Sequence, residues 1–155
     1  AQLDRFLMKL EMGYPDKNAE VEILNRFLSD NPITELGSVC KKQDIIDMKK
    51  QAKEVYIHPA LIEYIAELAG ATRKLSDVAI GISPRGSIAM VNAAKAYAYV
   101  KGRDYVVPSD IKELSVCVWA HRLVFGTGIV SKDGRAQAVN SAFAQVAVPT
   151  EEWTK

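Results

Sequence analysis

The residues that decide the fold class are SPRGSIAMVNAAKAYAYVKG, at positions 83–102. Ser83 offers a capping hydroxyl, and Pro84 is tolerated at the first helical position because its missing N–H would have no partner there. Apolar residues then recur at helical spacing until a glycine ends the pattern: Ile88, Val91, Ala94, Ala98 and then Gly102. The stretch therefore predicts a helix with one buried face.

Similar patterns lie on both sides of this stretch. Asp16 can cap one helix, and Pro59 and Pro108 can each start another. Apolar residues at helical spacing predict helices over 17–28, 42–56, 59–70 and 108–125. Residues 75–82 are expected to form a loop or a short extended piece, and residues 135–148 either a helix or an extended run. With little to build a sheet from, the chain is expected to be all-α, a small bundle of four or five helices.

Residues 1–15 have a different pattern. The first residues look like the end of a helix, and Leu7 to Met12 form a short extended run that stops at Gly13-Tyr14-Pro15. Such a run cannot form a sheet by itself. The sequence begins at Ala1, without an initiator Met and without a capping residue ahead of the helical pattern, so we expect it to be a piece of a longer protein.

The composition is that of an ordinary globular protein, with 155 residues of which 48% are hydrophobic and 25% charged. Because 20 basic residues nearly balance 19 acidic ones, no global field favours nucleic acid or an anionic membrane surface. No stretch reaches the ~18 apolar residues of a membrane span. Cys40 and Cys117 lie far apart, outside any metal-binding spacing, so a reduced, cytoplasmic setting and no metal site are expected.

Few motifs in the chain carry chemistry, since it lacks a nucleophile elbow, an HExxH pair, a calcium loop and a phosphate-binding loop. His58 is expected to cap a helix or lie exposed, and His121 to be a hydrogen-bonded structural residue on an apolar helix face. Arg85 stands out because a cation in the first turn of a helix meets the positive end of the helix dipole, at a cost of roughly 0.3–1 kcal/mol. Two interpretations stay open: a side chain extended into solvent, or a side chain that binds an anion together with the helix N-terminus.

Six motifs stand in order between residues 1 and 125. They are Ala1-Gln2-Leu3-Asp4-Arg5-Phe6-Leu7, Gly13-Tyr14-Pro15, Tyr64-Ile65 leading to Ala71-Thr72-Arg73, Ser83-Pro84-Arg85 with Ala93-Ala94-Lys95-Ala96, Gly102-Arg103-Asp104-Tyr105-Val106, and His121-Arg122-Leu123. In order and spacing they closely resemble the MoxR family of AAA+ ATPases. Gly86 departs from the Ala that is frequent in the family, and Val107 from the usual capping Thr or Ser, so both helix starts are expected to be weaker.

The resemblance implies a fold and a domain organisation. Residues 1–15 would be a C-terminal remnant, helix and strand, of the α/β ATPase core. Residues 16–125 would form the helical lid domain, and residues 126–155 a C-terminal extension that packs on the lid.

The resemblance also implies roles for individual residues. Arg5 resembles an arginine finger that reaches the nucleotide of a neighbouring subunit, and Arg85 resembles the sensor 2 residue of the lid. Ser83 and Pro84, just before it, belong to the same nucleotide-binding motif. Both arginine roles need a planar, permanently charged group that meets the charge spreading over the γ-phosphate oxygens.

Cofactors and partners follow from the same resemblance. ATP and Mg²⁺ are implied for the full-length protein, which would form a homo-oligomeric ring and remodel or mature client complexes, often with proteins that carry von Willebrand A-type domains. The phosphate loop, the acidic magnesium-binding segment and the sensor 1 residue are missing from these residues. The fragment alone is therefore expected to bind neither cofactor and to be inactive, and neither a membrane nor nucleic acid is expected as a partner.

Two other function classes fit the residues without any nucleotide. A helical interaction module would dock a partner helix on the broad apolar faces. A DNA-binding helical domain would use the lysines around the second expected helix, but acidic residues interleave with them, and a solvated face explains that charge at least as well. The lysines are Lys41, Lys42, Lys49, Lys50 and Lys53, and the acidic residues are Asp44, Asp47 and Glu54.

Overall fold

The computed structural model describes residues 2–29, 31–126 and 130–150. It divides into two units, one of residues 10–47 and the other of residues 1–9 together with 48–155. We refer to the second as the bundle unit. The described residues contain six α-helices and one two-stranded sheet, which confirms a predominantly helical fold.

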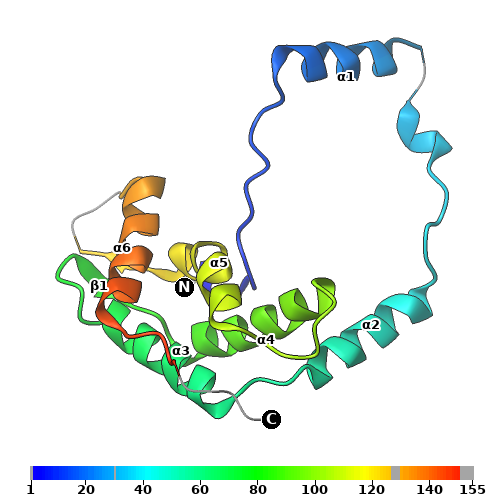
Figure 1. Cartoon of the computed structure of the whole chain (residues 1–155). Coiled ribbons are helices and arrows are strands. Elements are labelled where there is room, and N and C mark those ends of the chain that lie inside the picture. The colour runs from blue at the N-terminus through cyan, green and yellow to red at the C-terminus, as the bar shows by residue number, and fades with distance from the viewer. Residues whose placement is uncertain (1, 30, 127–129, 151–155) are drawn as a thin grey trace. The chain divides into compact units, whose positions relative to one another are not determined.

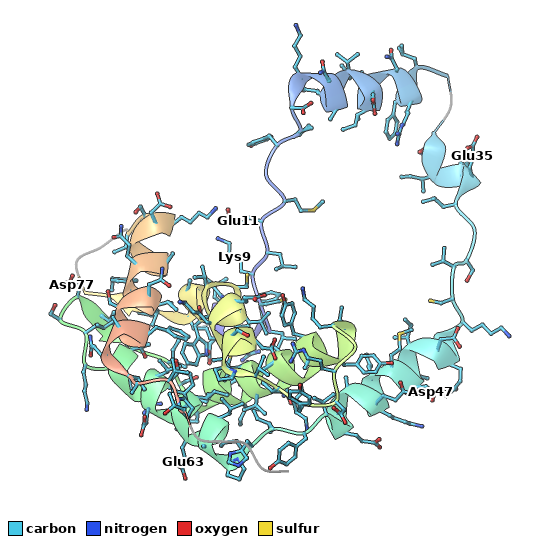
Figure 2. The ribbon with its side chains drawn as sticks, in the orientation of Figure 1. Lys9, Glu11, Glu35, Asp47, Glu63 and Asp77 are labelled. Atoms are coloured by element: carbon cyan, nitrogen blue, oxygen red, sulfur yellow. The ribbon has the colours of Figure 1, made fainter. Side chains whose placement is uncertain are left out.

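Four helices build the bundle unit: α3 (Pro59–Thr72), α4 (Pro84–Val100), α5 (Pro108–Trp119) and α6 (Lys132–Gln145). Helix α4 packs on α5 and α3, and α6 packs on α3 and α5 (Figure 1). The buried face of α4 is mostly alanine, which lets its neighbours approach closely, while α3 and α5 supply the larger core side chains. The largest fully buried ones include Leu61, Ile65, Leu68, Met90, Ile111 and Trp119. Charged residues such as Glu63 on α3 and Asp77 before β1 remain at the surface (Figure 2).

The helix starts follow the local signals in the sequence. The Ser83 hydroxyl accepts a hydrogen bond from the Gly86 N–H at 3.3 Å, and His58 Nδ1 accepts one from the Ala60 N–H at 3.2 Å. His58 is thus a capping residue, as expected. Val107 has no capping oxygen, and the Asp110 carboxylate instead accepts from the Val107 N–H at 2.9 Å.

The largest difference from the expected elements lies after α5. The helix expected over 108–125 ends at Trp119, and η3 (Ala120–Arg122) and β2 (Val124–Phe125) follow it. Strand β2 pairs antiparallel with β1 (Val78–Ile80), with Val78 opposite Phe125. The backbone groups of residues 124–125 therefore bind those of a distant segment instead of continuing the helix. The undecided C-terminal stretch is helical, since Ser131 caps α6 through the Gly134 N–H at 3.1 Å. Residues 127–129 and 151–155 of the expected extension lie outside the described residues.

The first residues belong to the bundle unit. Leu3–Arg5 form a single 3₁₀ turn, η1, and the extended run over 7–12 forms no strand, as expected of a segment without a neighbouring strand. The Lys9 N–H donates to the Cys117 carbonyl at 2.8 Å, so this segment is tied to α5. The domain boundaries drawn from the sequence stay predictions.

The unit of residues 10–47 contains α1 (Lys17–Ser29), η2 (Pro32–Glu35) and the first part of α2 (Lys42–Glu54). Asp16 caps α1 through a hydrogen bond from the Ala19 N–H at 2.8 Å, as its position predicts. The expected apolar face of α1 is exposed in this structure, from 47% for Val21 to 80% for Leu28.

Candidate functional site

Arg85 lies where the sequence places it, in the first turn of α4. Its side chain is exposed, and within the described residues its guanidinium makes no hydrogen bond or ion pair. The first turn of α4 contains no acidic residue that would balance the cation. Within the first turn of α4 itself, no side chain relieves the unfavourable interaction of Arg85 with the helix dipole.

Arg5 is the last residue of η1 and is also exposed. Among the described residues, no hydrogen bond or ion pair reaches its guanidinium, although its neighbour Asp4 is strongly engaged. The two arginines that the sequence singled out are thus both exposed and without a hydrogen bond or ion pair among the described residues. A third exposed arginine, Arg73, lies next to the start of α4, where its Nε donates to the Ile82 carbonyl at 2.8 Å.

Asp4 connects the segments that carry these arginines. Its carboxylate accepts a hydrogen bond from the Ser83 hydroxyl, with O···O distances of 3.3 and 3.4 Å. Ser83 therefore uses its hydroxyl twice, as the cap of α4 and as a donor to Asp4. Residues 79 positions apart in the chain are brought together at the N-terminus of α4.

Arg122 completes this connection, and reasoning from the sequence gave it no role. Its side chain is 2% exposed and forms an ion pair with Asp4, at 2.7 Å between Nη1 and Oδ1. Nη2 donates to the Phe6 carbonyl at 2.6 Å, and Nε donates to the Val118 carbonyl at 2.8 Å. A buried charge needs such partners. The sequence did mark Arg122 in two ways, as part of the motif His121-Arg122-Leu123 and as the neighbour of the expected structural histidine.

His121 is the structural residue that the sequence predicted. It is 7% exposed, and its Nε2 lies 3.2 Å from the Phe6 carbonyl oxygen. Because a carbonyl only accepts, Nε2 carries the proton of this hydrogen bond. Burial lowers the pKa of His121, and the neighbouring Arg122 cation lowers it further. This shift favours the neutral imidazole, whose Nε2–H helps Arg122 to hold the N-terminal segment.

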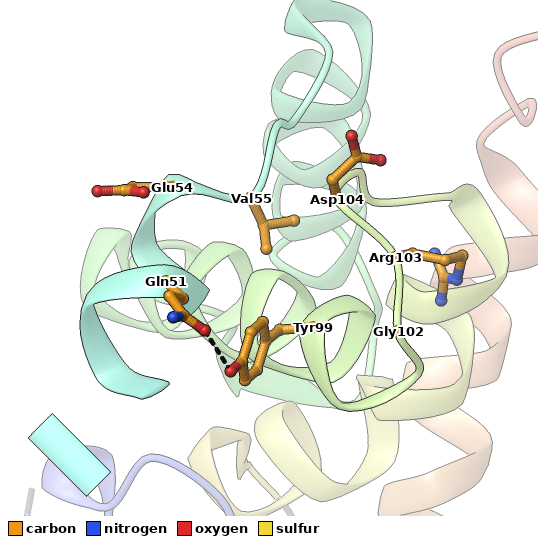
Figure 3. A pocket seen from close by; sticks show the side chains of 7 residues that line it. All are labelled: Gln51, Glu54, Val55, Tyr99, Gly102, Arg103 and Asp104. Carbon is orange, nitrogen blue, oxygen red and sulfur yellow. Dashed lines mark hydrogen bonds between the residues drawn. The ribbon is translucent and has the colours of Figure 1, made fainter. Parts of the chain in front are cut away.

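A separate open pocket of about 390 Å³ lies where the C-terminal end of α2 meets the loop after α4 (Figure 3). Tyr99 donates its hydroxyl proton to Gln51 Oε1 across it, at 2.6 Å. Its lining residues are Gln51, Glu54, Val55, Tyr99, Gly102, Arg103 and Asp104. None of them is a site residue expected from the sequence, and Arg103 is already paired with Asp110 at 2.5 Å.

The described part of the chain contains no group of three or more His, Cys, Asp or Glu residues that could hold a metal ion. None of its helices combines the length and the apolar character needed to cross a membrane. Neither result bears on Arg5 and Arg85, whose chemistry is that of cations facing an anion.

Comparison with known proteins supplies the context of this arrangement. Residues 70–149 match the AAA lid domain family. YeaC of Bacillus subtilis, an uncharacterised protein, is 40% identical over 97% of this chain and 48% of its own length. Chaperone MoxR1 of Mycobacterium tuberculosis is 35% identical over 96% of this chain and 42% of its own.

A solved structure from Cytophaga hutchinsonii, described as an ATPase, superposes with a TM-score of 0.83 at 29% identity. The match covers 96% of this chain and 48% of that one. The chain thus spans about half the length of the relatives it matches.

Proposed function

This chain belongs to the MoxR family of AAA+ ATPases and carries the AAA lid domain, and from that membership we propose that the complete protein couples ATP binding and hydrolysis to chaperone-like remodelling or maturation of partner proteins. In this proposal Arg85 contacts the nucleotide bound by its own subunit, as sensor 2. Arg5 contacts the nucleotide of a neighbouring subunit, as an arginine finger.

One observation carries the proposal. Arg85 projects, exposed and without a partner among the described residues, from the first turn of α4, where its own helix disfavours a cation. A phosphate group at this position would interact with both the guanidinium and the helix N-terminus, and the local penalty would become a contribution to binding.

The same charge accounts for the proposed catalytic step. Negative charge spreads over the γ-phosphate oxygens as the bond to the leaving group breaks, and a planar guanidinium can donate two hydrogen bonds to them. An arginine supplied from a neighbouring subunit typically raises the rate by ~10³–10⁵. Mg²⁺ would neutralise phosphate charge when bound.

The wider context follows from the proposed family role. The complete protein acts as a homo-oligomeric ring, because an arginine finger requires a neighbour. Its clients include proteins with von Willebrand A-type domains or other complexes that need maturation, and it works in the cytoplasm. ATP and Mg²⁺ are its cofactors, and neither a membrane nor nucleic acid is a partner.

The test of the sensor role uses the full-length protein with an Arg85→Ala substitution. A lost charge-assisted hydrogen bond is worth roughly 1.5–3 kcal/mol, so nucleotide affinity, turnover or both should fall by about ten- to a hundredfold. Lys112→Ala, which removes an exposed cation of α5, is the matched control and should stay near the wild type. Unchanged turnover and unchanged nucleotide affinity in the Arg85 variant would count against the sensor assignment.

The finger role calls for mixed rings. Subunits that carry Arg5→Ala can bind ATP but cannot complete a neighbour's site, whereas subunits unable to bind ATP can still supply Arg5. When an excess of the latter surrounds each Arg5→Ala subunit, activity should recover, and homogeneous Arg5→Ala rings should be nearly inactive. Full activity of the homogeneous rings would refute the role.

A protein-interaction module without a nucleotide role is the second candidate. It is favoured by the exposed apolar side chains of the unit of residues 10–47, such as Phe27 at 56% and Leu36 at 77%. This candidate predicts that Arg85→Ala and Arg5→Ala leave all nucleotide measurements unchanged, so the same experiments decide between the two.

A further inference from the structure

We infer that Arg122 and Asp4 form a latch that holds the Arg5 segment against the start of α4 and so sets the positions of Arg5 and Arg85 together. Arg122 and Asp4 are then positioning residues for ATP hydrolysis, since their charges are paired with each other. The inference rests on the proposed function.

The Arg122 guanidinium binds several groups of the Arg5 segment at once. Its guanidinium donates to the carboxylate and the carbonyl of Asp4, at 2.7 and 2.5 Å, and to the carbonyls of Phe6 and Leu7, at 2.6 and 3.3 Å. Backbone carbonyls that a neighbouring strand would otherwise bind are thus bound by one side chain. Nε, donating to the Val118 carbonyl, fixes the plane of the guanidinium relative to α5.

The Asp4 carboxylate links Arg122 to the start of α4. The carboxylate that accepts from Arg122 also accepts from Ser83, the residue that caps α4. Arg5 follows Asp4 directly, and Arg85 follows Ser83 by two residues. A displacement of Asp4 would therefore move the backbone next to both functional arginines.

Gly86 makes room for this arrangement. A Cβ at this position would lie 3.2 Å from Arg122 Cδ and 2.7 Å from Ile82 Cγ2, so a glycine here leaves space for the Arg122 side chain beside α4. Gly86 and Arg122 therefore pack against each other, and a larger residue at position 86 would displace the Arg122 side chain.

The Lys9 amide reports on the latch without any enzymatic assay. It follows the latched segment (Figure 2) and donates to the Cys117 carbonyl at 2.8 Å. If Arg122 releases residues 4–7, this amide should exchange with solvent faster. Hydrogen–deuterium exchange of a peptide spanning residues 6–12 measures this in the full-length protein.

The variants are Arg122→Gln and the milder Asp4→Asn, which keeps the side-chain size and removes the charge. Arg103→Gln is the matched control, because Arg103 likewise forms an ion pair with one buried member, Asp110 at 2.5 Å, but in the loop after α4. Each latch variant should raise exchange over residues 6–12 at least tenfold and lower kcat at least tenfold, and the control should change either by less than twofold.

A background that lacks both functional arginines separates positioning from general stability. In an Arg5→Ala/Arg85→Ala protein, adding Arg122→Gln should not lower the residual kcat further, because the latch acts only through those two side chains. A further loss there would overturn the inference, since a merely structural effect would persist in this background.

The exchange and turnover measurements can contradict the latch without contradicting the proposed function. Faster exchange with unchanged kcat, in a protein whose activity does depend on Arg5 and Arg85, would overturn the latch as a positioning device and leave the proposed function intact. Unchanged exchange in both latch variants would overturn it as well. If Arg5→Ala and Arg85→Ala leave turnover unchanged, the proposed function fails and the positioning role fails with it.

Discussion

The indole N–H of Trp119 donates a hydrogen bond to the carbonyl oxygen of Gly86, at 3.0 Å, and so joins the end of α5 to the first turn of α4. Trp119 is fully buried, and Gly86 lies in the turn that presents Arg85. The geometry of the candidate site therefore depends on a residue of the core as well as on the latch. Stability measurements on variants of these internal contacts test this dependence.

Trp119→Phe should lower the free energy of unfolding by about 2–4 kcal/mol. The substitution removes the donor to the Gly86 carbonyl and leaves a space next to Phe143, whose ring centroid is 6.5 Å from that of Trp119. Urea unfolding followed by far-ultraviolet circular dichroism measures the change without relying on tryptophan fluorescence. A loss below about 0.5 kcal/mol would mean that the contact is dispensable.

Gly86→Ala should destabilise the protein by about 1 kcal/mol, although alanine is the better helix former. The gain of up to about 1 kcal/mol in helix propensity is outweighed by about 1–3 kcal/mol of overpacking, because the new Cβ would lie 2.7 Å from Ile82 Cγ2.

Gly70→Ala on α3 is the control for this effect, since a Cβ there meets nothing within 4 Å. It should raise stability by about 0.5–1 kcal/mol. Thermal unfolding of the two variants should therefore shift in opposite directions. Shifts of the same sign would show that helix propensity, and not packing against Ile82, decides the effect at residue 86.

Local chemistry explains which features the sequence could predict. The starts of α1, α3 and α4 follow from capping residues within three positions of the N–H groups that they bind, as with Asp16 and Ala19. The pairing of β1 with β2 and the role of Arg122 depend on partners far away in the chain, up to 118 positions for Arg122 and Asp4. No spacing rule along the chain contains that information, so the family motif marked Arg122 without revealing what it binds.

Val107→Thr should raise the free energy of unfolding by about 0.5–1 kcal/mol. Val107 has the extended backbone of an N-cap residue but no side-chain acceptor, and a threonine hydroxyl would bind a free N–H in the first turn of α5 while keeping one methyl group. Val106→Thr is the control, because Val106 is 5% exposed and its hydroxyl would be buried without a helix end to bind. The first variant should unfold at higher temperature than the wild type and the second at lower temperature. Destabilisation by Val107→Thr would indicate that the lost valine packing outweighs the cap.

His121 should make stability depend on pH below about 6.5, the pKa of an unperturbed imidazole. Burial, and then the Arg122 cation, lower the pKa of the folded imidazole below the value of about 6.5 expected in the unfolded chain. Between the two values the unfolded chain binds a proton that the folded chain does not. The free energy of unfolding should therefore be highest above pH 6.5 and fall as the pH drops towards the folded pKa.

His121→Gln tests this dependence, because glutamine can still donate to the Phe6 carbonyl but does not titrate. Its unfolding free energy should vary less with pH over this window than that of the wild type. His58→Asn is the control, since it removes the only other imidazole of the chain and keeps an acceptor at the start of α3. Equal pH slopes in the wild type and the His121 variant would contradict the prediction. A pH slope lost only in the His58 variant would also contradict it, because the pH dependence would then not come from His121.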